Sequence, residues 1–87
     1  MTDLRGPVLA VAKDALNGLN VSAEDRKKIA GWLIGMETAT NADDAQGFAD
    51  ALSLKVAEYE IHAAGVAEKA LWAVITRVAS VAVGSLL

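Results

Sequence analysis

Few residues in this chain have the type and spacing that chemistry requires. Glu58 and His62 lie four apart, so a helix would place them on one face, as it would two metal ligands. A zinc site needs three or four ligands, and the chain has one histidine and no cysteine. We interpret the pair as a contact between two side chains on the solvent-exposed face of a helix, and we expect no metal ion.

Patterns typical of catalysis are also missing. The sequence contains no glycine-rich phosphate loop and no serine followed in order by histidine and aspartate. Asp43 and Asp44 are adjacent, so a helix does not turn them toward each other. We therefore expect a protein that is not an enzyme and that holds no cofactor.

The charge balance argues against nucleic acid as a partner. The chain has 11 acidic and 8 basic side chains, and its one basic cluster is residues 26–28. The first 13 residues lack the long apolar run of a signal peptide. The absence of cysteine fits a reducing compartment, so that setting or an assembled particle is favoured.

Two short helices are expected in the first half of the chain. The first, near 7–18, begins with Pro7 in its first turn and ends at Gly18, which can take the left-handed conformation. The second, near 22–40, has Ser22 as its N-cap, followed by acidic residues that suit a helix N-terminus.

Within the second helix, Gly31 and Gly35 lie four apart, which suits the close approach of a neighbouring helix. Glycine also weakens a helix by about 1 kcal/mol relative to alanine. The alternative, that the two glycines only weaken the helix, carries the same weight. Trp32 of this helix and Phe48 further along the chain are expected in the core.

A third helix is expected from 43 to 85, with Gly65 as the only candidate break. At 1.5 Å per residue it would span about 60 Å, more than the first two helices can cover. The predicted fold is all-α: an N-terminal hairpin, residues 1–42, clasps the long helix of residues 43–87 within one domain. Oligomerisation would complete the bundle.

The surface expected to meet another molecule is a seam at alternating spacings of three and four along the long helix, as in a coiled coil. Trp72 lies beside this seam, and an interface role for it carries the same weight as a core role. The predicted interface residues are Leu54, Ala57, Ile61, Ala64, Leu71, Trp72, Ile75, Val78 and Ala82.

Arg77 is the only charge in residues 70–87 and is expected to pair with an acid or with the chain-terminal carboxylate of Leu87 in a neighbour. An antiparallel neighbour would bring Glu58 or Glu60 close to it. The alternative is that its long stem carries the guanidinium to solvent, which needs no partner.

Three functions are consistent with these features. The first is a non-enzymatic structural protein that forms a homo-oligomer or docks to a larger complex, such as a virus or phage particle. The second is membrane action through residues 70–87, whose length is close to the minimum for a bilayer span but which contain Arg77 and several hydroxyl side chains. Thr76, Ser80 and Gly84 have the spacing of small residues at membrane helix contacts, and a polar stripe on a soluble bundle helix is the alternative with at least the same weight. The third is a small regulator that inhibits a partner through a helix face.

Overall fold

The computed structural model describes residues 5–87, which form four helices of similar length and no strand. They are α1 (Arg5–Asn17), α2 (Ala23–Thr38), α3 (Ala42–Ile61) and α4 (Val66–Gly84). The all-α prediction is confirmed for these residues. The prediction that the N-terminal segment is not a signal peptide rests in part on residues 1–4, which lie outside the described residues.

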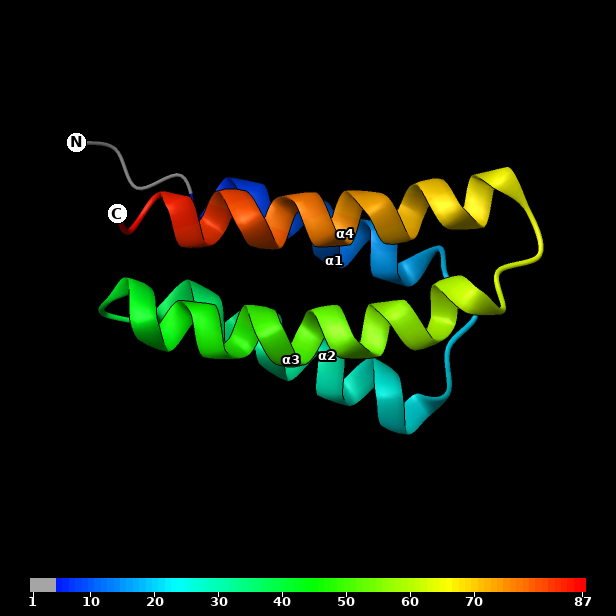
Figure 1. Ribbon diagram of the computed structural model, residues 1–87, viewed down its shortest axis with the longest axis horizontal. Coiled ribbons are helices and arrows are strands. Elements are labelled where there is room, and N and C mark those ends of the chain that lie inside the picture. The colour runs from blue at the N-terminus through cyan, green and yellow to red at the C-terminus, as the bar shows by residue number, and fades with distance from the viewer. Residues whose placement is uncertain (1–4) are drawn as a thin grey trace.

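The helices pack as an up-down-up-down bundle in which consecutive helices are antiparallel (Figure 1). α4 and α1 form one layer, and α3 and α2 form the other. The bundle measures 39 × 20 × 18 Å. The start of α1 and the end of α4 lie at the same end of the bundle, opposite the turn between α3 and α4.

The predicted long helix is wrong: residues 42–84 form two helices that reverse direction at residues 62–65. The reversal occurs at the one candidate break, Gly65. A straight helix would leave the apolar face of each half in water, whereas folding back lets Leu52 and Val56 of α3 share a core with Trp72 and Ile75 of α4. The expected clasp of two short helices around one long helix is therefore replaced by a bundle of four.

Local hydrogen bonds stabilise this reversal. The His62 and Ala63 amides donate to carbonyls three residues back, Tyr59 and Glu60, which tightens the last turn of α3. Gly65 is the extended N-cap residue of α4 and offers no capping side chain. Glu68, three residues later, compensates by accepting a hydrogen bond from the backbone N–H of Ala64 at 3.4 Å.

One core runs through all four helices. Its largest members are fully buried and come from every helix: Leu9, Ile29, Leu33, Met36, Leu52, Trp72 and Ile75. Burying each such side chain contributes about 1.5–3 kcal/mol. This chain therefore buries Leu52, Trp72 and Ile75 of its C-terminal half without help from another molecule, while Leu54, Ile61 and Val66 stay exposed.

Two arginines cap the first two helices reciprocally. Arg5, at the start of α1, donates to the Met36 and Ala39 carbonyls at the end of α2, at 3.0 and 2.6 Å. Arg26, at the start of α2, donates to the Leu16 and Leu19 carbonyls at the end of α1, both at 2.8 Å. Each cation thus donates to carbonyls at a helix C-terminus, where a positive charge is favourable.

This arrangement corrects the cap expected at Gly18. No glycine among residues 5–87 has a positive φ, so Gly18 does not adopt the left-handed conformation. The Gly18 and Leu19 amides close the last turn of α1 onto the Ala15 and Leu16 carbonyls, and Arg26 adds its own hydrogen bonds there. The predicted N-cap of α2 is present, because the Ser22 hydroxyl accepts from the Asp25 amide at 3.1 Å. At the start of α3, the Asn41 side chain accepts from the Asp44 amide at 2.9 Å.

The two glycines of α2 have different surroundings. A Cβ built on Gly35 would lie 2.7 Å from three ring atoms of Phe48, so the bare backbone lets that ring from α3 lie against α2. A Cβ on Gly31 would meet nothing within 4 Å. The close approach expected at both positions is therefore realised at Gly35 alone.

We expect Gly31→Ala to stabilise the protein by about 0.5–1 kcal/mol, because alanine loses less backbone entropy in a helix and the site has room for its methyl group. Gly35→Ala should gain less or become destabilising, because the methyl group must displace Phe48. Urea denaturation of the two variants measures both effects.

The matched test is Gly35→Ala combined with Phe48→Ala. Removing the ring should restore the benefit of Gly35→Ala relative to Phe48→Ala alone. If Gly31→Ala and Gly35→Ala stabilise equally in the wild-type background, the contact between Phe48 and the backbone of α2 is wrongly placed.

Candidate docking surface

The first four predicted interface residues lie on the solvent face of α3 and its following turn. Leu54 is 73% exposed and Ile61 is 79% exposed, and Ala57 and Ala64 are exposed as well. On the helix, Leu54 and Ile61 point away from the buried side of α3, which contains Leu52. The term outer strip is used below for Leu54, Ala57, Ile61 and Ala64.

The remaining five predicted interface residues turn toward the chain itself. Trp72, Ile75, Val78 and Ala82 are buried, and Leu71 is half-buried against the core. In a straight helix they would share a face with the outer strip, but the reversal at residues 62–65 changes the direction of the second half. The structure therefore separates the seam into an exposed part and a core part.

The aromatic residues are placed differently from the expectation. Trp72 is fully buried, whereas Trp32 is half-buried and Phe48 is 37% exposed. Trp32 and Phe48 line a shallow groove of about 500 Å³ between α2 and α3, with Asp43 and Asp44 at its edge. The core placement predicted for these two aromatic side chains is therefore only partly correct.

The outer face of α4 has a small apolar hollow. Ala70, Ala73, Val74 and Arg77 enclose about 230 Å³. Arg77 is exposed and makes no ion pair within residues 5–87. In a single copy of the chain its guanidinium therefore lies in solvent, as the second interpretation of this residue expects. Its guanidinium remains available to an acid outside the chain.

A second groove separates α3 from α4 and encloses about 490 Å³. The small stripe Thr76, Ser80 and Gly84 lines one side of it, and Ser53 of α3 lies on the other. None of the helices in residues 5–87 is long and apolar enough to cross a membrane. The stripe thus lies along a helix–helix groove.

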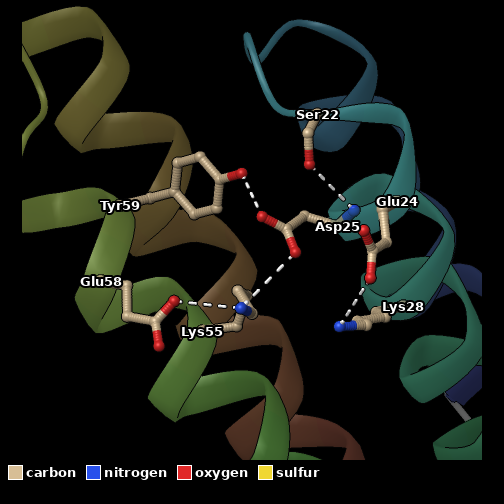
Figure 2. A network of polar contacts seen from close by, with 7 residues as sticks. All are labelled: Ser22, Glu24, Asp25, Lys28, Lys55, Glu58 and Tyr59. Atoms are coloured by element: carbon tan, nitrogen blue, oxygen red, sulfur yellow. Dashed lines mark hydrogen bonds and ion pairs between the residues drawn. The ribbon is translucent and has the colours of Figure 1, made fainter.

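A polar network fixes α3 against the start of α2 (Figure 2). Tyr59 donates a hydrogen bond from its hydroxyl to the Asp25 carboxylate. Lys55 lies 3.5 Å from the other oxygen of Asp25 and 3.0 Å from Glu58. Ser22 caps the same turn of α2, so five side chains hold α3 against the start of α2.

The network shifts two pKa values. The hydrogen bond from Tyr59 lowers the pKa of Asp25 below its ordinary value of 3.8; partial burial opposes this shift and the charge of Lys55 supports it. Glu58 raises the pKa of Lys55 above its ordinary value of 10.5, and Asp25 adds to this effect. Both side chains therefore keep their charges across the neutral range.

The Tyr59 ring also packs on Trp72, with centroids 5.0 Å apart and planes inclined by 22°. This stack links the network to the core of α4 beside the reversal. The Trp72 Nε1 atom is buried and has no hydrogen-bond partner among the described residues, which costs about 1–3 kcal/mol. Burial of the large indole ring offsets that cost.

Glu58 and His62 do not form a metal site with other residues. No group of three or more histidine, cysteine, aspartate or glutamate side chains within residues 5–87 is placed to hold a metal ion. Glu58 pairs with Lys55, and His62 is the exposed C-cap residue of α3. The basic cluster is also divided, because Arg26 caps α1 and Lys28 pairs with Glu24 at 3.3 Å.

Sequence reasoning missed the network and the hollow on α4. The spacing of Gly65 and Glu68, an N-cap position followed three residues later by an acid, was the available signal for the reversal. Recognising it would have assigned Leu52 and Val56 to the core and the outer strip to solvent. The pairing of Asp25 with Tyr59 has no local signal, since 34 residues separate them.

No protein-family model, curated protein or solved structure matches the chain.

We expect Tyr59→Phe to lower the free energy of unfolding, and to lower it most at neutral pH. Asp25 has a lower pKa in the folded than in the unfolded chain, so its contribution is present above pH 3.8 and is lost as the pH falls through the folded value. The free-energy difference between wild type and Tyr59→Phe should therefore shrink as the solution is acidified. Chemical denaturation at a series of pH values measures it.

Phenylalanine keeps the ring on Trp72, so this variant isolates the hydroxyl group. The control is Glu24→Gln, which removes an exposed pair with Lys28 and should have little effect. A difference between wild type and Tyr59→Phe that stays constant down to acidic pH would show that Tyr59 does not interact with the ionised form of Asp25.

Proposed function

We propose that this protein is a non-enzymatic assembly subunit that associates with further copies of itself through the outer strip of α3. The observation that supports the proposal is the exposure of Leu54 and Ile61, two large aliphatic side chains seven residues apart on one helix face. Ala57 lies between them, and the small side chain of Ala64 follows.

Single exposed apolar residues are common on soluble proteins and need no explanation. Here, however, two side chains that are nearly three-quarters exposed or more repeat at the heptad spacing of a coiled coil. Covering each would contribute up to about 1.5–3 kcal/mol, which is a sizeable part of a binding free energy.

The support beneath the strip also suits a docking surface. Lys55, Glu58 and Tyr59, on the turns between Leu54 and Ile61, belong to the network that joins α3 to α2. A helix fixed in this way loses little conformational entropy on binding. A standard interface buries about 800 Å² of solvent-accessible surface on each partner. This is a minor part of the 5224 Å² of surface that this chain exposes.

The native mass of the protein tests the proposal. Sedimentation or light scattering over a range of concentrations should show particles larger than one chain. Ile61→Asp should shift the population to the monomer, because it places a carboxylate in a surface that must lose water. Since Ile61 is exposed, helix content by circular dichroism should be retained.

The matched control is Ile34→Asp, the same substitution at a residue of α2 that is 52% exposed. It should leave the native mass unchanged. A wild-type protein that stays monomeric at every concentration, or an equal effect of the two substitutions, would contradict association through the outer strip.

A further inference from the structure

The hollow on α4 has the form of a hole in coiled-coil packing. Such a hole is made by four residues of one helix, at positions i, i+3, i+4 and i+7, and receives one side chain from the facing helix. Ala70, Ala73, Val74 and Arg77 have this spacing and together line the hollow. All four are exposed in the folded chain.

A second set with the same spacing follows along α4 and extends from its outer face to the border of the groove between α3 and α4. It consists of Arg77, Ser80, Val81 and Gly84, all exposed, with Val81 at 47%. Arg77 is shared by the two sets, and their centres are seven residues apart, roughly 10 Å along the helix.

The outer strip provides side chains at the same interval. Leu54 and Ile61 are also seven residues apart and protrude from α3. When one of them enters the first hole, the other reaches the second. Glu58 lies between Leu54 and Ile61, so it falls opposite Arg77 whether the two helices run parallel or antiparallel.

Charge selects this pairing over the packing of α3 on a second α3. α3 contains five acidic residues and one basic residue, and that base, Lys55, is already paired with Asp25 and Glu58. Two α3 helices face to face would repel each other. α4 contains one acidic and two basic residues, and Arg77 is the charge that belongs to both sets.

We infer that the outer strip of one copy docks on the outer face of α4 of the next copy, with Leu54 and Ile61 in the two holes and Glu58 beside Arg77. This inference rests on the proposed self-association and specifies its geometry. The contact joins two different surfaces, so each copy offers one of each. Repetition of such a contact gives a ring or an open chain of subunits.

Mixing two variants tests the inference. Ile61→Asp damages the strip and leaves the holes intact; Ala73→Glu fills a hole with a charge and leaves the strip intact. Each variant alone should bind itself at least about 30-fold more weakly than wild type, the effect of losing a central contact. An equimolar mixture should recover association as pairs of chains, because each variant supplies the surface that the other lacks.

Ala10→Glu, an exposed alanine of α1, is the control and should associate like wild type. If wild type associates and Ile61→Asp does not, but Ala73→Glu associates normally or the mixture stays monomeric, the strip binds something other than α4 and this inference is overturned while the proposed function stands. If wild type itself is monomeric, the proposed function fails first. Circular dichroism confirms that each variant is folded.

Discussion

The reversal of the chain between α3 and α4 is the constraint on which the rest of the bundle depends. Both helices have one face that must leave water, and residues 62–65 let those faces meet. With the reversal in place, α1 covers α4 and α2 covers α3, and the loops remain short. Trp72 becomes a central core residue, and the stack with Tyr59 joins the turn to the polar network of Asp25.

The same reversal decides which surfaces remain for other molecules. It turns the acidic α3 and the nearly charge-free outer face of α4 toward solvent on different layers of the bundle. Polar caps hold the supporting helices in register. Among them, Arg5 of α1 donates to the end of α2, and Arg26 of α2 donates to the end of α1. Rigid helices with unlike faces favour specific association between those faces over nonspecific association, because contact between two faces of like charge costs free energy.

Local signals predicted much of this fold. Helical periodicity, the caps at Ser22 and Asn41 and the boundaries of the first two helices follow from interactions within a few residues. The reversal was missed because alanines on both sides of Gly65 favour a helix and the gain from folding back arises from contacts distant in the sequence. That one error misassigned the core side of α3 and the second half of the seam. Arg26 could not be recognised as a cap, because its carbonyl partners belong to another helix.

The two tryptophans lie in environments that differ in their access to water. Trp72 is sealed in the core beside Tyr59, whereas Trp32 borders the open groove between α2 and α3. Indole fluorescence shifts to longer wavelength as water reaches the excited ring, so the emission spectrum is a sum of a blue component and a redder one. Covering the α2–α3 groove changes only the red component, while loss of the core changes the blue one. The unmodified chain thus carries an optical reporter for each event.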